Sequence, residues 1–86
     1  MAKVTMLYWA AAKEAAGVAT ESVEARTLAE ALDVIVGRRA GDERFRSVLA
    51  ASSFLVNGQP AGRRVPADLV LPEDSRVEVL PPFAGG

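Results

Sequence analysis

The sequence contains neither cysteine nor histidine. Without cysteine, disulfides, thiol nucleophiles and thiolate metal sites are all excluded. Without histidine, the chain lacks the usual general base with a pKa near neutrality and the usual imidazole metal ligand. Carboxylates, hydroxyl groups, Tyr8, Lys3 and Lys13 remain, and they are a poor set for catalysis. We therefore expect a protein that is not a catalyst on its own.

The chain also lacks a strong net charge and a long apolar run. Its formal net charge of -1 argues against a nucleic-acid partner. No segment approaches the roughly 20 apolar residues that a membrane-spanning helix needs. No basic and apolar leader precedes Lys3, so we expect a cytoplasmic protein that binds neither nucleic acid nor membrane.

Half of the residues are hydrophobic, which suits one compact domain. Residues 3–9 are a β-branched and aromatic run that predicts a strand, and we expect both of its faces to be covered because neither is polar. Alternation over residues 19–26 predicts a second strand that forms a hairpin with the first. Between them, residues 10–16 are strong helix formers, and Gly17 would end that helix.

The clearest helix is predicted to follow Thr27. Thr27 and Glu30 match a capping box, in which each side chain satisfies a backbone N–H of the first turn. Apolar residues then recur with a period of about 3.6 residues along one stripe. The stripe consists of Leu28, Ala31, Leu32, Ile35 and Val36. We expect Gly41 to end this helix and residues 42–51 to form a short second one.

Three further strands complete the pattern. Residues 54–56 predict a strand, and the tight-turn dipeptide Asn57-Gly58 leads into a short irregular strand within residues 59–65. Residues 76–80 predict the last strand. This element order predicts an α+β fold, the ubiquitin-like β-grasp, with a mixed four- to five-stranded sheet. One main helix would pack across that sheet, with short extra helices beside it.

The most specific motif is an extended tail, residues 81–86, after a domain of residues 1–80. Pro81-Pro82 cannot donate to a ladder, so the sheet must end before these residues. Gly85-Gly86 has no side chains, and the six tail residues reach roughly 20 Å beyond the sheet. A slender tip on a stiff base suits the passage of a carboxylate into a narrow pocket of another protein. The alternative is a frayed terminus that happens to end in glycine.

The whole chain resembles the small subunit of molybdopterin synthase and related prokaryotic sulfur carriers. The resemblance rests on KVTMLYWAAAKEAAG at the start, FLVNG in the middle and VEVLPPFAGG at the end. It implies that a ubiquitin-activating-like adenylyltransferase uses ATP to adenylate the Gly86 carboxylate. That group then becomes a thiocarboxylate with sulfur from a sulfurtransferase. The chain itself would bind no cofactor and no metal.

The resemblance further implies a role in molybdenum cofactor biosynthesis. The large subunit of molybdopterin synthase would take Phe83, Ala84 and Gly85 into a tunnel that leads to its active site. Sulfur would pass there to a cyclic pyranopterin monophosphate and build the dithiolene of molybdopterin. The chain would thus be the sulfur-donating subunit of a sulfurtransferase. Lys13 and Glu14 match a basic-acidic pair that the family carries after its first strand.

A docking patch is predicted beside the tail. The first and last strands of a β-grasp are parallel neighbours, so Trp9 and Leu80 would lie at the same edge of the sheet. By alternation both point away from the main helix, and Leu7 joins them on that face. We expect these residues to form an apolar docking patch with Arg76 and Glu78 at its rim.

Several alternatives stay open. The segment 63–69 could fold over the patch, and Lys13-Glu14 could be an ordinary exposed helix pair. Similar carriers serve thiamine, cysteine and tRNA thiolation pathways, although the ending LPPFAGG favours molybdopterin. Gly86 could instead be joined to a target lysine, as in a ubiquitin-like protein modifier, or the tail could be idle on a plain interaction module. Arg63-Arg64 has no counterpart in the family and receives no role.

Overall fold

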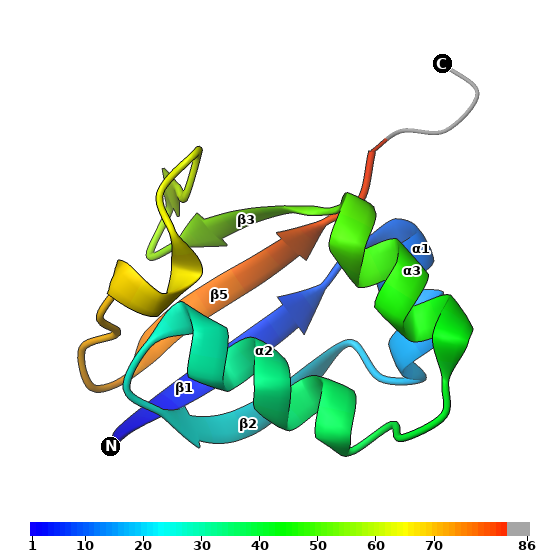
Figure 1. The fold of residues 1–86 in the computed structure, drawn as a ribbon, viewed down its shortest axis with the longest axis horizontal. Helices are drawn as coiled ribbons and strands as arrows, with labels where there is room; N and C mark the ends of the chain where they lie inside the picture. The colour runs from blue at the N-terminus through cyan, green and yellow to red at the C-terminus, as the bar shows by residue number, and fades with distance from the viewer. Residues whose placement is uncertain (83–86) are drawn as a thin grey trace.

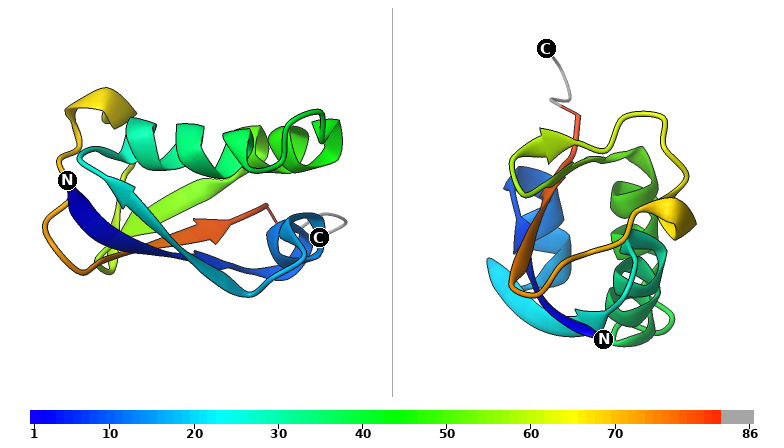
Figure 2. Two further views of the ribbon diagram at one scale, coloured as in Figure 1. Left: turned by 90° about the horizontal axis from the view of Figure 1, so that it is seen from below. Right: turned by 90° about the vertical axis from the view of Figure 1, so that its left-hand side faces the viewer.

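Within residues 1–82, which the computed structural model describes, five strands form one sheet and α2 and α3 lie on one of its faces (Figure 1, Figure 2). The order of the strands in the sheet is β2-β1-β5-β3-β4. The elements along the chain are β1 (Ala2–Tyr8), α1 (Ala10–Ala16), β2 (Thr20–Ala25), α2 (Leu28–Gly37), α3 (Glu43–Ala51), β3 (Ser53–Val56), β4 (Gln59–Pro60), the 3-10 helix η1 (Pro66–Asp68) and β5 (Ser75–Leu80). This arrangement is the α+β β-grasp that the sequence predicts.

The central strands β1 and β5 run parallel to each other. Their register pairs Val4 with Ser75 and Tyr8 with Val79. Val4, Met6, Tyr8 and Val79 are buried because they point toward the helix layer. Since the strands are parallel, both end at the same edge of the sheet, which places the residue after β1 close to the residue after β5.

The opposite face of β1 is open in the part of the chain that the structure describes. Leu7 is half-buried there, and Trp9 is 50% exposed. The segment 63–69 returns to the helix side, where the Leu28 N–H donates to the Leu69 carbonyl at 2.9 Å (Figure 2). The expectation that both faces of the first strand are covered is therefore wrong for residues 1–82, and so is the alternative that this segment covers the patch.

The main helix α2 begins at the predicted cap. The Thr27 Oγ1 atom accepts a hydrogen bond from the Glu30 N–H at 3.2 Å. The Glu30 carboxylate accepts from the N–H of Arg26 at 2.8 Å, so it serves the residue before the cap instead of the first turn. The helix ends at Gly37 and not at Gly41, because Gly37 is a weak helix former and Gly41 lies in the following turn with φ +83°.

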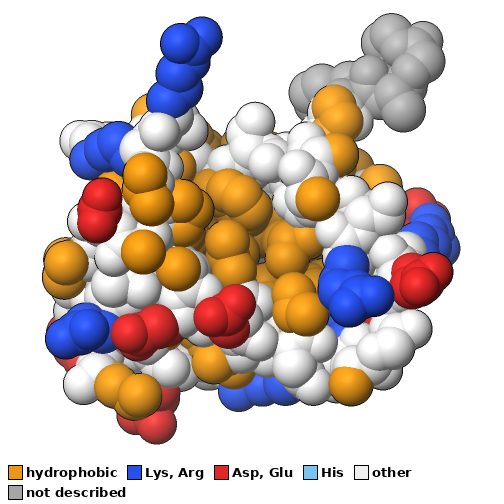
Figure 3. Space-filling model, viewed as in Figure 1, with side chains coloured by type: hydrophobic (Ala, Val, Ile, Leu, Met, Phe, Trp, Pro, Cys, Tyr) orange, Lys and Arg blue, Asp and Glu red, His pale blue; other side chains and the backbone are white. Residues whose placement is uncertain are grey.

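The helix layer covers the sheet unevenly. Leu28 and Ile35 of α2 and Phe45 of α3 are fully buried and form the centre of the core. Phe54 and Val56 of β3 point to the same side but are only partly buried. Figure 3 shows hydrophobic side chains gathered in the middle of this helix face. The cover is thus dense over β1 and thinner over β3.

The turn between β3 and β4 follows the predicted dipeptide. Asn57 and Gly58 have φ of +51° and +83°, and two positive φ values are what a two-residue type I′ hairpin turn requires. The strand after it spans only Gln59–Pro60, much less than residues 59–65. Pro60 explains the short strand, because proline has no N–H to donate to a ladder.

Candidate functional site

Trp9 and the root of the tail lie together at one edge of the sheet. The backbone N–H of Trp9 donates to the Val79 carbonyl at 3.3 Å. Strand β5 ends at Leu80, immediately before Pro81-Pro82. The chain therefore leaves the sheet beside Trp9, at the end of the molecule away from the N-terminus (Figure 1). The predicted tail-insertion and sulfur-bearing residues lie outside the described residues: Phe83, Ala84, Gly85 and Gly86.

The sheet face that points away from α2 carries apolar side chains around Glu78. The register places Leu7 and Leu55 directly across from Glu78, one on each side. Leu80 follows Glu78 on the same face of β5. The three leucines are half-buried, whereas Trp9 is exposed. We call this set the outer patch: Leu7, Trp9, Leu55, Glu78 and Leu80.

The outer patch differs in two respects from the patch that the sequence predicts. It includes Leu55, which the alternation of residues 54–56 could have identified because Phe54 and Val56 face the helices. It also places Glu78 among the apolar residues, where the sequence interpretation puts it at the rim. The Trp9 Nε1 donates to the Glu78 Oε1 at 3.0 Å, so the indole lies over the same face of the sheet.

A shallow groove next to α1 connects with the outer patch. Gly17 ends α1 in the left-handed conformation, and its N–H donates to the Lys13 carbonyl at 3.0 Å. The groove has a volume of about 770 Å³, and its lining includes Trp9, Lys13 and Glu14. A smaller groove of about 190 Å³ joins Leu7 to Lys13. The structure thus brings the predicted pair Lys13 and Glu14 to the side of Trp9.

The root of the tail forms one wall of a small apolar notch beside α1 and α3. The notch has a volume of about 240 Å³, and its lining consists of Ala11, Ser47, Val48, Ala51, Pro81 and Pro82. Pro81 is half-buried and Pro82 is exposed. The fixed φ of the two prolines restricts the direction in which the chain leaves the domain.

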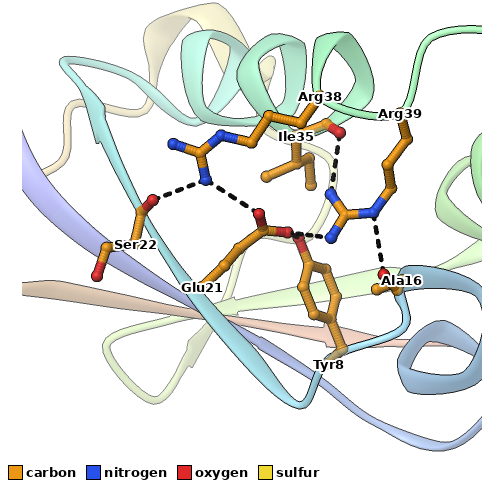
Figure 4. Close-up of polar contacts among 7 residues, drawn as sticks. All are labelled: Tyr8, Ala16, Glu21, Ser22, Ile35, Arg38 and Arg39. Carbon is orange, nitrogen blue, oxygen red and sulfur yellow. Dashed lines mark hydrogen bonds and ion pairs between the residues drawn. The ribbon is translucent and has the colours of Figure 1, made fainter.

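On the inner face, Glu21 is the centre of a polar cluster (Figure 4). Its carboxylate accepts hydrogen bonds from the Tyr8 hydroxyl and from the Arg38 Nη1 at 3.0 Å, and it forms an ion pair with the Arg39 Nη2 at 2.6 Å. Burial opposes ionisation of Glu21, but the hydrogen bonds from Tyr8, Arg39 and Arg38 outweigh it and lower the pKa of Glu21. The pKa of Tyr8 is raised, mainly because the hydroxyl group is buried and secondly because it donates a hydrogen bond to Glu21. We call these four residues the inner cluster.

Arg39 extends the inner cluster to all three α-helices. Its Nε donates to the Ala16 carbonyl at the end of α1 at 3.2 Å, and its Nη1 donates to the Ile35 carbonyl of α2 at 3.1 Å (Figure 4). Its guanidinium carbon lies 4.6 Å from the ring centre of Phe45 in α3. Arg39 therefore holds α1, and with it the groove that contains Lys13, against the rest of the domain.

Sequence reasoning missed the inner cluster, although one signal was present. Glu21 alternates in step with Val23 and Ala25, which puts a carboxylate on the buried face of an amphipathic strand. A charge in such a position needs partners. Arg39 carries no comparable signal, because it follows the end of α2 and its direction depends on the tertiary structure.

The described residues offer neither a metal site nor a membrane span. Within residues 1–82, no three His, Cys, Asp or Glu side chains gather closely enough to hold a metal ion. No helix in the same range is long and apolar enough to cross a membrane. The features that stand out are therefore the outer patch, the groove beside α1 and the tail root.

Solved structures share this fold over nearly their whole length. The small archaeal modifier protein 1 of Methanosarcina acetivorans gives a TM-score of 0.76 at 22% identity, covering 100% of this chain and 98% of that chain. A putative molybdopterin converting factor subunit 1 of Pyrococcus furiosus gives 0.74 at 28% identity, with 95% and 99% covered. A complex of subunits 1 and 2 of the molybdopterin-converting factor of Helicobacter pylori 26695 gives 0.68 at 20% identity, with 98% and 99% covered.

The sequence itself matches a known family. No curated protein matches the chain in sequence. A profile of the ThiS family, however, matches residues 6–86. The structural likenesses confirm the β-grasp fold, and the profile extends over nearly the whole chain. The protein therefore belongs to the ThiS family of ubiquitin-like sulfur carriers.

Proposed function

We propose that this chain is the sulfur-carrying small subunit of molybdopterin synthase. The observation that supports the proposal most directly is that the tail root, Pro81-Pro82, follows the end of β5 beside an apolar patch that no other segment of residues 1–82 covers. A partner that binds the patch receives the tail at the same time. The likeness to a putative molybdopterin converting factor subunit 1 points to the same role.

The proposed chemistry takes place at the Gly86 carboxylate. A carboxylate is a poor electrophile because its negative charge resists attack, so a ubiquitin-activating-like adenylyltransferase uses ATP to make the acyl adenylate. A sulfurtransferase supplies sulfur at the oxidation level of sulfide, which attacks the acyl carbon, displaces AMP and leaves a thiocarboxylate. Each thiocarboxylate then donates one sulfur atom to cyclic pyranopterin monophosphate and returns to the Gly86 carboxylate, so two charged chains are needed to build the two-sulfur dithiolene of molybdopterin. The carrier needs no cysteine or histidine for any of these steps.

The proposed partner is the large subunit of molybdopterin synthase. Leu7, Trp9 and Leu80 of the outer patch would bind it, with Lys13 and Glu14 alongside in the groove of α1. Phe83, Ala84 and Gly85 would enter its tunnel. The complex of subunits 1 and 2 from Helicobacter pylori contains a chain of the same fold, which is why we choose this class of partner.

A ubiquitin-like protein modifier is the second candidate. It is favoured by the likeness to small archaeal modifier protein 1, although 22% identity carries the fold alone. Both candidates need an activated carboxylate at Gly86, and they differ in what is attached there. A sulfur carrier gains a sulfur atom, whereas a modifier forms an amide bond with a target lysine. Sulfur transfer in thiamine, cysteine or tRNA thiolation pathways would share the first two steps.

The intact mass of the protein from its own cells tests these candidates. A sulfur carrier should show the mass increase that replacement of one oxygen by sulfur produces, and a chain without Gly86 should not show it. Supply of the large subunit and cyclic pyranopterin monophosphate should then return the mass to that of the carboxylate as dithiolene forms. A population joined to other proteins would favour the modifier. A matched control with one alanine added after Gly86 should be inactive in every role that uses the tail.

A further inference from the structure

The outer patch has a carboxylate among its apolar side chains. Glu78 lies directly across from Leu7 on β1 and from Leu55 on β3. Leu80 follows on the same face of β5 and borders the tail root. The indole of Trp9 donates to the Glu78 Oε1 at 3.0 Å. Apolar or aromatic groups of the same domain therefore border this carboxylate on three sides.

The Glu78 carboxylate has no cationic partner in the part of the chain that the structure describes. The ion pairs there involve Glu21 and Glu30. Arg76, the arginine on the same face of β5, lies across from Thr5 and forms no ion pair with Glu78. Trp9 is a neutral donor that occupies one of the two carboxylate oxygens. The other oxygen, Oε2, depends on solvent or on a partner.

Binding of a partner to the outer patch changes the solvation of the Glu78 carboxylate. Contact with Leu7, Leu55 and Leu80 excludes water from the face of the sheet, and the charge of Glu78 then loses solvation. A purely apolar partner would leave the Oε2 atom of the carboxylate desolvated and without a donor, which opposes binding. An acidic partner would add repulsion. A cation at this position makes the most favourable contact, because a hydrogen bond between two charged groups is stronger than one from a neutral donor.

We propose that the large subunit presents a basic side chain, an arginine or a lysine, to the Oε2 atom of Glu78 when it binds the outer patch. This inference rests on the proposed function, because it assigns the chemistry of the partner that receives the tail. Glu78 then acts as a specificity-determining residue. The hydrogen bond from Trp9 holds the carboxylate in place, and an arginine suits the site because it can also stack on the exposed indole.

The chain offers a matched control on the same sheet face. Glu24 of β2 is exposed and lies across from Lys3, at the end of β1 away from Trp9 and the tail root. It is a glutamate in a strand, as Glu78 is, but it already faces a cation and lies outside the outer patch. A change at Glu24 removes the same charge from the molecule without altering the proposed contact.

Binding of the purified large subunit tests the proposal. Its Kd is measured by titration calorimetry for the full chain and for the variants Glu78→Gln, Glu78→Lys and Glu24→Gln, at low and at high salt. We expect Glu78→Gln to raise Kd by about tenfold or more and Glu78→Lys to raise it further, while Glu24→Gln leaves it unchanged. The Kd of the unmodified chain should rise with salt more steeply than that of Glu78→Gln. Urea unfolding checks that the variants are folded.

Two outcomes would contradict the idea, and they can be told apart. If Glu78→Gln binds as tightly as the unmodified chain, with the same salt dependence, the carboxylate meets no cation. That result overturns this inference and leaves sulfur carriage intact. If the unmodified chain does not bind the large subunit at all, the proposed function itself fails and this inference fails with it.

Discussion

Tyr8 and Trp9 are neighbours in the sequence, and each donates a hydrogen bond to a glutamate on a different face of the sheet. Tyr8 is buried, and its acceptor Glu21 also meets Arg38 and Arg39. Trp9 is exposed, and its acceptor Glu78 forms no ion pair within residues 1–82. The same pairing of an aromatic donor with a carboxylate thus occurs once in a closed environment and once in an open one.

The difference follows from solvation. Glu21 is partly buried, with 14% of its side chain exposed, and both cations and a neutral donor replace the water that its carboxylate loses. Glu78 is also partly buried, but its hydrogen bond with Trp9 lies at the surface, so its carboxylate keeps contact with water and needs no cation in the isolated chain. The inner cluster therefore holds the domain together, and through Arg39 it also fixes α1. Substitutions in the outer patch should affect the free energy of unfolding less than substitutions in the inner cluster. Their main effect should be on the affinity for the partner.

The largest effect should follow the loss of Arg39. Arg39→Ala leaves the Glu21 carboxylate with fewer partners in a partly buried position and removes the contacts to α1 and to Phe45. We expect the free energy of unfolding to fall by about 3 kcal/mol, measured by urea denaturation at neutral pH. The variant also tests whether the inner cluster, and not only the hydrophobic core, holds the helices against the sheet.

Arg38→Ala is the matched control for that measurement. Arg38 pairs with the same carboxylate, but its side chain is 46% exposed where that of Arg39 is 13% exposed. Its loss should lower the free energy of unfolding by no more than about 1 kcal/mol. Equal losses for the two arginines would mean that burial does not distinguish the two ion pairs.

The next largest effect is expected from substitutions in the outer patch, and it should be on the affinity for the large subunit. Trp9→Ala removes a large exposed aromatic residue from the outer patch, and Leu80→Arg puts a charge beside the tail root. Each should weaken binding of the large subunit by about 2 kcal/mol, the scale of an interface hot spot, when Kd is measured by calorimetry. The free energy of unfolding should change by less than about 1 kcal/mol for Trp9→Ala, because the side chain is half exposed. Normal affinity in both variants would refute docking at the outer patch.

An intermediate effect is expected from the pH dependence of the stabilisation that Glu21 of the inner cluster provides. The folded-state pKa of Glu21 lies below its ordinary value of 4.5, so the unfolded chain takes up the proton first as the pH falls. The stabilisation that Glu21 provides is complete well above pH 4.5 and is lost as the pH falls through the folded-state pKa. The unmodified chain should therefore lose stability toward acid faster than Glu21→Gln, by at most about 1.4 kcal/mol per pH unit. Urea unfolding of both proteins between neutral and acidic pH measures this difference, and parallel curves would contradict it.

Much of the fold could be predicted from the sequence because local signals agreed with the tertiary structure. The capping residue Thr27 and the dipeptide Asn57-Gly58 act within a few residues, so they identify the start of α2 and the β3–β4 turn. The end of α2 was harder to predict, because either Gly37 or Gly41 could end a helix and the sequence does not distinguish them. The prediction that the first strand is covered on both faces was wrong because the path of the chain after β4 is a tertiary property.

The site could be predicted only in part, for a related reason. Alternation along single strands placed Leu7, Trp9 and Leu80 on one face, and the structure agrees with that placement. The position of Glu78 between Leu7 and Leu55 depends on the register of three strands, which the chain order alone does not give. The inner cluster depends on the direction of Arg39 after a helix end, and no local pattern indicates it.

The smallest effect should come from Glu78→Gln, measured as stability of the isolated chain. Glutamine keeps an oxygen that can accept the hydrogen bond from the Trp9 Nε1, and the residue is not fully buried, so the free energy of unfolding should change by less than about 0.5 kcal/mol. The same change at Glu21 should cost several times more, because it removes a charge from between two guanidinium groups. Urea unfolding of both variants at neutral pH compares the two faces with one chemical substitution. Equal losses would mean that Glu78 is already part of the folded core, and its carboxylate would then not be free to meet a partner.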